Sequence, residues 1–473
     1  MMFLQHAVRR FLLLCLGAAA PMLILADRAS AVQDNADEEL LGLVTEWLTG
    51  SDADLRTLAL EQVRTEAKGA AATQRFAALL PSLPAEGQVG LLQALAERRD
   101  GAARPAVLGV MKSEHESVRV AALRCLGDLG TSDDFPLLVE RLRSGLEAER
   151  TMAAASLVRL PGDQVPERLA DQIGTLAESA PRVKLIEIVV ERRAAAVVPT
   201  LLELGLSPDL SVRQAALAAV GQLGSPEHIT RLVSAVIVTK ASEREWPEKA
   251  IVAIYNRHPK LNQQPMHPVL EEFFKLSGDE QAAVLPAVGR VGGSRAREVV
   301  DWYVKHPYPF VSDVGWRALS LWPDASVAPD LLAAVEKPAN DQRRALAFKA
   351  LVRVAGLADD SLEVLQRLDW LKAAARLAKD DDERLLVLKR LSAVRDIESL
   401  RFAMSFVEQP TLTEQACQAI VELAHLRWLR DEFKDEFMAA LDRVQSASRD
   451  PIVQERAQRY KEGKTWTGPG VGS

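Results

Sequence analysis

Cysteine, aromatic residues and long apolar runs are all scarce in this sequence of 473 residues. Three cysteines cannot form a disulfide framework, and they are too few for a zinc ribbon or a cluster site. Aromatic residues make up only 5% of the chain although hydrophobic residues make up 48%, so the apolar mass is mainly Ala, Leu and Val. Together with 26% charged residues, this composition is typical of a protein built from helices.

An excess of basic residues is also missing. The 58 basic and 65 acidic residues give a net charge of −7. A general nucleic-acid binder needs a basic face, and a peripheral binder of anionic membranes needs basic clusters. The sequence therefore predicts no nucleic-acid partner and gives no support for binding at a membrane surface.

The first 31 residues have the layout of a secretory signal peptide. Arg9 and Arg10 precede an uncharged, mostly apolar stretch at 11–26, and the small residues of 29–31 precede a polar run. The sequence therefore predicts cleavage after Ala31 and export to the periplasm or the extracellular space.

Three other interpretations of this segment stay open. An uncleaved anchor would need roughly 20 apolar residues, whereas this stretch has sixteen and contains Pro21. Lipidation of Cys15 is an alternative, but Leu14 stands where a small residue is typical. The two arginines also resemble a twin-arginine signal with imperfect spacing. No other stretch of the chain has the length of a membrane span, so the mature chain is expected to have none.

The remainder of the chain is an internal repeat. Four similar segments carry an arginine at the same place, at Arg119, Arg150, Arg182 and Arg213, with gaps of 31, 32 and 31 residues. Weaker copies extend to both sides. At about 32 residues each, the chain after the signal holds about thirteen units, and helices of such units bury their apolar faces only by stacking.

Each unit has two helices and a defined boundary between them. The first helix carries the arginine and a run of Ala and Leu, and a glycine ends it. A Ser, Thr or Asp then starts the second helix, as in Thr131 after Gly130 and Ser225 after Gly224. The glycine stops are Gly130, Gly162, Gly224, Gly292 and Gly356.

This pattern resembles the short HEAT repeat, the phycobilisome-lyase-like type, in an exported bacterial member. The resemblance rests on Val-Arg-x-Ala-Ala-Leu-x-x-Leu-Gly at 118–127 and Val-Arg-x-Ala-Ala-Leu-x-x-Val-Gly at 212–221. The resemblance implies an all-α fold, a right-handed α-solenoid over 32–462, and a concave binding surface lined by the second helix of each pair. It implies an interaction scaffold more often than a catalyst.

Residues 246–322 interrupt the Ala-Leu pattern with ten of the 24 aromatic residues and three His-Pro pairs. Large rings in degenerate repeats can fill gaps in the packing, whereas exposed rings mark interfaces, and a small-molecule site is a further alternative. If the section binds a partner, the expected anchors flank or follow the break at 306–307. They are Trp302, Tyr303, Tyr308, Phe310 and Trp316.

No catalytic, cofactor or metal constellation stands out. The histidines of the three His-Pro pairs are expected to be solvated rather than to bind metal. The acidic run at 380–383 precedes a helix, where carboxylates cap, with calcium binding as the alternative. Gly-Arg-Val-Gly-Gly-Ser at 289–294 is interpreted as an inter-helix turn. The repeated arginine suggests a structural ladder with neighbouring Asp or Glu side chains.

The sequence thus predicts an exported, non-catalytic and monomeric scaffold that binds a protein or an envelope ligand through its concave surface. The alternatives are a chromophore lyase, which the family resemblance evokes, and a HEAT-type DNA glycosylase, which the acidic balance disfavours. The tail at 463–473 is Gly-rich, and its Trp466 is expected to fold back on the last helix as a cap. Cys125 and Cys417 are expected in the core.

Overall fold

The computed structural model describes residues 41–50, 52–65, 69–358, 362–466 and 468. All regular structure in this part is helical, and no strand occurs there. None of its helices is long and apolar enough to cross a membrane. The expected signal peptide at 1–31 and most of the tail lie outside the described residues. The chain divides into unit 1, up to Leu223, and unit 2, from Gly224 onward.

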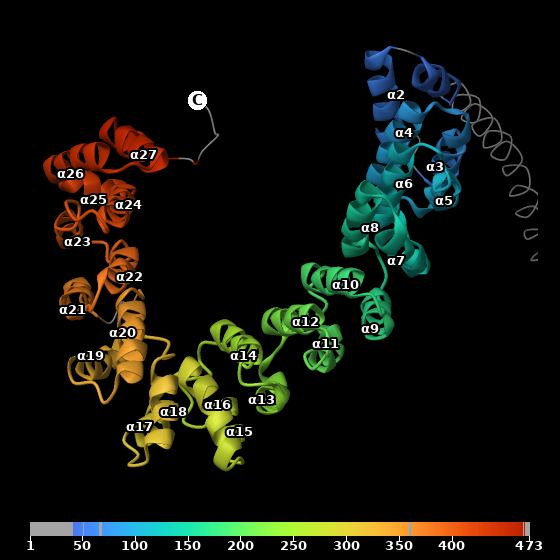
Figure 1. The fold of residues 1–473 in the computed structure, drawn as a ribbon. Helices are drawn as coiled ribbons and strands as arrows, with labels where there is room; N and C mark the ends of the chain where they lie inside the picture. Colours follow the sequence, from blue (N-terminus) through green and yellow to red (C-terminus); the bar gives the residue numbers. More distant parts are fainter. Residues whose placement is uncertain (1–40, 51, 66–68, 359–361, 467, 469–473) are drawn as a thin grey trace, which may run out of the picture. The chain divides into compact units, whose positions relative to one another are not determined.

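Unit 1 is a two-layer stack (Figure 1). Its first layer consists of helices that each pack on the next one in the series. They are α2 (Ala53–Thr65), α4 (Ala85–Arg98), α6 (Glu116–Leu129), α8 (Glu147–Arg159), α10 (Ser179–Glu191) and α12 (Leu210–Leu223). The second layer contains the helices between them. They are α3 (Ala70–Ala77), α5 (Arg104–Val110), α7 (Phe135–Ser144), α9 (Val165–Thr175) and α11 (Val198–Leu204).

Unit 2 repeats this arrangement (Figure 1). Its first layer contains α14 (Glu245–Arg257), α16 (Gly278–Val291), α18 (Pro309–Leu319), α20 (Asp341–Ala355), α22 (Asp381–Leu391) and α24 (Thr413–Ala424). Its second layer contains α13 (Ile229–Val238), α15 (Pro268–Phe273), α17 (Ser294–Val304), α19 (Ala328–Glu336), α21 (Val364–Leu377) and α23 (Ile397–Met404). The unit ends with α25 (Arg427–Glu432), α26 (Lys434–Ala447) and α27 (Pro451–Lys461).

The spacing of the first-layer helices confirms the repeat. In unit 1 they begin at residues 53, 85, 116, 147, 179 and 210, which are 31 or 32 positions apart. In unit 2 the steps from α14 onward are 33, 31, 32, 40 and 32 residues. The step of 40 contains α21, which has 14 residues where α19 has 9. In chain order, α2 to α27 form thirteen pairs.

The predicted helix boundary at 130–131 is confirmed, although the role of its glycine differs. Thr131 caps a short 3₁₀ turn at Ser132–Asp134 through a capping box with Asp134. Gly130 has φ −70°, so it does not need the left-handed conformation. A Cβ there would lie 2.4 Å from the carbonyl oxygen of Leu126. Glycine is therefore required for space at this position, whereas Gly162 and Gly292 have positive φ angles of 124° and 71°.

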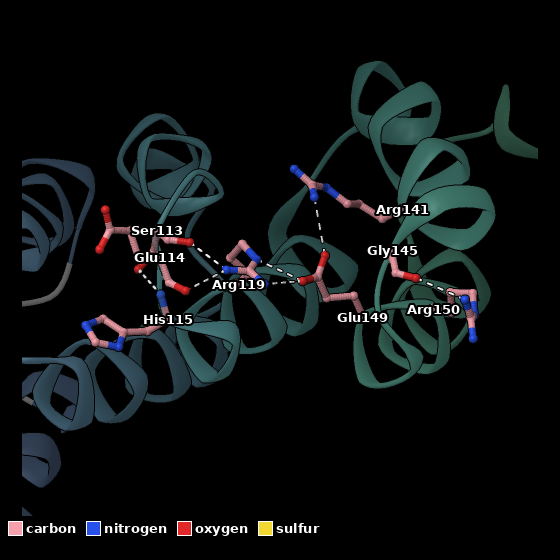
Figure 2. A network of polar contacts seen from close by, with 8 residues as sticks. All are labelled: Ser113, Glu114, His115, Arg119, Arg141, Gly145, Glu149 and Arg150. Atoms are coloured by element: carbon pink, nitrogen blue, oxygen red, sulfur yellow. Dashed lines mark hydrogen bonds and ion pairs between the residues drawn. The ribbon is translucent and has the colours of Figure 1, made fainter.

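The repeated arginines bind the loop that precedes their own helix. Arg119 donates to the carbonyl oxygens of Ser113 and Glu114, at 2.7 and 3.0 Å, and Arg150 donates to that of Gly145 at 3.1 Å (Figure 2). Arg182 and Arg213 bond in the same way to carbonyls 5 to 9 residues upstream. The shared partner is thus the backbone at the end of a second-layer helix, rather than the acidic side chain that the sequence suggested.

An acidic partner is present in one repeat. Glu149 is buried and lies between Arg119, at 2.6 Å, and Arg141, at 3.3 Å (Figure 2). Two guanidinium groups therefore compensate one buried carboxylate, which is the condition under which a buried charge is tolerated. This network holds α6, α7 and α8 together and is structural, as expected for the ladder.

A second set of arginines joins successive first-layer helices. Each stands near the end of its helix and donates to carbonyl oxygens 31 to 35 residues upstream, at the end of the preceding first-layer helix. The arginines are Arg98, Arg159, Arg192 and Arg353. The last carbonyls of a helix lack partners within it and carry partial negative charge, so a cation there is favourable. The sequence analysis missed this set.

The inner side of unit 2 is formed by the first layer. In Figure 1 the first-layer helices follow the inner side of this unit's curve, and the second-layer helices follow its outer side. The expectation that the second helix of each pair lines the concave surface is therefore wrong for unit 2. Small residues give the reason, because the α16 and α18 backbones approach so closely at Gly289 that a Cβ would lie 2.3 Å from the carbonyl oxygen of Ala318. The more closely spaced layer lies inside the curve.

Candidate partner-binding surface

Three large aromatic side chains project into solvent around the junction of α17 and α18. Trp302 in α17 is 60% exposed, and Tyr308 and Phe310 at the start of α18 are 69% and 71% exposed. Large rings are normally buried, so three exposed rings within nine residues form an apolar patch of the kind that marks interfaces. We call Trp302, His306, Tyr308 and Phe310 the aromatic surface.

The His-Pro break produces this exposure. Helix α17 ends at Val304, and α18 begins at Pro309 after an extended residue, Tyr308, with φ −81° and ψ 123°. The backbone N–H of Tyr308 donates to Nδ1 of His306 at 3.2 Å, which fixes the loop. The prediction that prolines end and start helices here is confirmed.

The rings of the aromatic surface are arranged in a row. The centroid of His306 lies 4.9 Å from that of Trp302 and 5.3 Å from that of Tyr308. These distances are typical of paired aromatic rings, which hold one another in place. A partner would therefore meet a preordered surface, with little side-chain entropy lost on binding.

A cavity of about 340 Å³ opens beside Trp302. Phe273, Phe274, Val299 and Tyr303 supply apolar walls, and Arg295 and Gln281 supply polar ones. Its size and mixed lining suit one side chain of a partner, held by apolar contact and a few hydrogen bonds.

Tyr303 is a core residue, unlike its neighbour Trp302. It is only 9% exposed, and its hydroxyl donates to Oε1 of Gln281 at 3.1 Å. Burial raises the pKa of the Tyr303 hydroxyl. The ring packs edge-on against Phe273, 6.3 Å away. Of the three rings expected to face solvent, Trp302 and Tyr308 therefore do so, and Tyr303 does not.

Trp316 is half-buried and lies between two further cavities, of about 330 and 410 Å³. The guanidinium carbon of Arg343 is 5.7 Å from the centroid of a Trp316 ring. Phe310 lines the larger of these cavities, and Trp316 lines both. The aromatic surface thus continues from α17 over α18 toward α20.

One of the three His-Pro histidines is buried, contrary to the expectation that all are solvated. His267 is fully buried, and Tyr255 lies with its hydroxyl 2.9 Å from His267 Nδ1. The same hydroxyl accepts from the backbone N–H of Val269 at 3.2 Å, so it donates its own proton to the histidine. Burial lowers the pKa of His267 to about 4. This pair anchors the start of α15 to α14.

The other candidate chemistry is structural in the described residues. Asp380 accepts from the N–H of Glu383 at 2.9 Å and caps α22, as predicted. Glu383 binds Arg344 through both carboxylate oxygens, at 2.8 and 2.9 Å, and this contact lowers the pKa of Glu383. Gly292 and Gly293 form the turn after α16. No group of three His, Cys, Asp or Glu side chains arranged to hold a metal occurs in this part of the chain.

The family and structure comparisons agree on helical repeats. The sequence model of the HEAT repeats matches residues 72–159. A comparison with curated proteins gives no match. Similar solved structures include a crystal structure of the karyopherin Kap121p bound to the extreme C-terminus of the protein phosphatase Cdc14p, at 13% identity and a TM-score of 0.42. Another is Kap95p in a complex with RanGDP, at 12% identity and a TM-score of 0.45.

The chain spans only part of these karyopherins. Alignment covers 90% of this chain in both cases, but 53% of the Kap121p chain and 60% of the Kap95p chain. A homology model of the full-length AP-3 complex aligns over 91% of this chain and 88% of that chain, at 15% identity and a TM-score of 0.36. The chain is therefore an all-α protein that contains HEAT repeats, with the family match at residues 72–159 and the same paired-helix stack in both units.

Proposed function

We propose that this protein is an exported, monomeric and non-catalytic scaffold that binds a protein partner through the aromatic surface of unit 2. The observation that carries the proposal is the exposure of Trp302, Tyr308 and Phe310 beside a cavity lined by further rings. Trp and Tyr are the residues most often found as binding anchors, because they offer a large contact area with few rotatable bonds. The export step rests on the layout of residues 1–31.

The ionisable groups buried in the stack support a scaffold rather than a catalyst. Glu149 is neutralised by two arginines, and Glu248 is held by Arg290 at 2.9 Å. His267 is enclosed with Tyr255. Each of these groups has a structural partner and lies away from the cavity beside Trp302. A catalytic group needs access to its substrate, so these groups serve packing.

The first step of the test is to crosslink the full chain in its native compartment and identify the crosslinked sites by mass spectrometry. Partner crosslinks are expected on α17 and the start of α18. The second step compares the double variant Trp302→Ala/Tyr308→Ala with Trp428→Ala. Trp428 is 56% exposed on α25 and lies outside the aromatic surface, so it controls for the loss of an exposed ring.

The double variant should lose about 2 kcal/mol or more of binding free energy at an unchanged melting temperature, and Trp428→Ala should bind normally. Tyr303→Ala should instead cost about 3–5 kcal/mol of stability, because it empties a buried ring position. If the double variant melts early and still captures the partner, the exposed rings have a packing role and the proposal fails.

A further inference from the structure

A polar cavity of about 400 Å³ lies in unit 1, along the C-terminal halves of α4, α6 and α8. Its polar lining consists of Gln93, Glu97, Arg99, Arg124, Asp128 and Arg159. Three arginines in one cavity stand out in a chain whose net charge is −7. The aromatic surface lies in unit 2, so the two features share no residue.

Both carboxylates of this cavity already have cationic partners. Glu97 pairs with Arg64 on α2, at 2.7 Å between Oε2 and Nε. Asp128 pairs with Arg159, at 2.9 Å between Oδ1 and Nε. Arg159 also donates to the backbone carbonyl of Arg124 as part of the arginine set described above. These contacts neutralise the acidic side chains and leave Arg159 in a structural role.

The side chains of Arg99 and Arg124 are exposed, and neither has a hydrogen-bond or ion-pair partner within the described ranges. They extend from neighbouring first-layer helices, α4 and α6. The cavity therefore carries two guanidinium charges that nothing in the described chain compensates. A guanidinium binds a carboxylate through two parallel hydrogen bonds, which is its preferred geometry.

We propose that this cavity binds an acidic segment of a protein partner, with one carboxylate at Arg99 and another at Arg124. Packed helices are about 8–10 Å apart, and alternate side chains of an extended strand are about 7 Å apart, so two nearby acidic side chains can reach both arginines. A dianionic phosphate suits the cavity less well, since it would concentrate its charge beside Asp128 and the negative ends of the helix dipoles. This site goes beyond the proposed aromatic contact.

The test measures binding of a fluorescent hexaglutamate peptide to the full chain by anisotropy, at low and physiological salt, with hexaglutamine as the neutral peptide. Hexaglutamate should bind with an affinity that falls as salt rises, and hexaglutamine should not bind. Arg124→Ala and Arg99→Gly should each weaken binding about fivefold. Arg99 has φ 53°, a conformation that glycine adopts freely, so this variant should fold normally.

Arg193→Gly is the matched control. Arg193 follows α10 with φ 55° and is exposed, but it does not line the cavity. This variant loses the same charge at the same kind of backbone position and should keep its affinity. Trp302→Ala should also bind hexaglutamate normally, which separates this test from that of the aromatic surface.

Four outcomes would overturn the proposal. They are equal binding of hexaglutamine, unchanged affinity in both Arg99→Gly and Arg124→Ala, an equal loss in Arg193→Gly, and displacement of the peptide by inorganic phosphate at the concentration of the peptide's own dissociation constant. The last result would identify a phosphate site in place of an acidic-peptide site.

Discussion

At the scale of single residues, the Tyr255–His267 pair connects burial to pH. His267 is enclosed and accepts a hydrogen bond at Nδ1 from Tyr255, so the folded chain holds the neutral imidazole. Burial lowers its pKa to about 4, whereas the unfolded chain has the ordinary value near 6.5. Between these two values the unfolded state binds more protons than the folded state, so stability falls as the pH is lowered through this window.

We expect the wild-type protein to lose roughly 2 kcal/mol of stability through this residue between pH 7.5 and pH 5. His267→Asn keeps an acceptor for Tyr255 but does not titrate there. Urea unfolding of both proteins at the two pH values measures the difference. The pH-dependent loss should be smaller in the variant by this amount, and equal losses in both proteins would mean that His267 is protonated without cost in the folded state.

The neighbours Trp302 and Tyr303 show what the sequence could not settle at this scale. Both are aromatic, and both flank the predicted break, so the sequence predicted the same role for the two. Successive helix residues point about 100° apart, so only one of them can face the neighbouring helices. Which one is buried depends on how α17 packs against Phe273 and Gln281, and those contacts come from other repeats.

At the scale of helices, the close approach of first-layer neighbours depends on glycine. A Cβ at Gly289 would lie 2.3 Å from the carbonyl oxygen of Ala318, so α16 and α18 touch through their backbones. A Cβ at Gly127 would lie 2.8 Å from the Cα of Ser156, which is the same relation between α6 and α8. The sequence predicted small residues in these helices but not which glycine marks the contact.

Gly289→Ala should therefore destabilise the protein by about 1–3 kcal/mol, because the two helices must separate. Alanine normally favours a helix over glycine, so Gly109→Ala is an informative control. Gly109 lies in α5 with nothing within 4 Å of its missing Cβ, and alanine there should be neutral or stabilising by up to about 1 kcal/mol. Chemical denaturation measures both. A stabilised Gly289→Ala would show that the contact between α16 and α18 yields easily.

The repeat itself was the most predictable feature at this scale. Boundaries at 130–131, 224–225 and 380–383 followed from glycine and from capping residues, which act within a few positions along the chain. The arginine contacts were harder to predict. Their partners are backbone carbonyls, which every residue possesses, so no pairing of residue types in the sequence identifies them.

At the scale of the whole molecule, the stack joins each repeat only to its neighbours. Such proteins are stabilised by local terms, so a change in one region weakens that region most. Cys125 in unit 1 and Cys417 in unit 2 are both free and buried. Burial raises the pKa of Cys125 to about 12 and that of Cys417 to about 11, so each thiol is unreactive until its surroundings open.

We expect thiol labelling in increasing urea, measured at each cysteine by peptide mass spectrometry, to report local unfolding of each unit. Neither thiol should react in the native protein. Gly289→Ala should lower the urea midpoint for Cys417 and leave that for Cys125 nearly unchanged. Equal shifts at both thiols would instead show that the chain unfolds as one cooperative body.

The arginines that donate to carbonyls one repeat upstream have a consequence for how such a chain can change over time. Arg98, Arg159, Arg192 and Arg353 recognise the end of a helix, whatever its side chains are. A repeat can therefore diverge without forcing its neighbour to follow, whereas a ladder of paired side chains would tie the two together. Duplicating or losing one whole period keeps every such contact, and any other insertion between two first-layer helices must be absorbed in a loop.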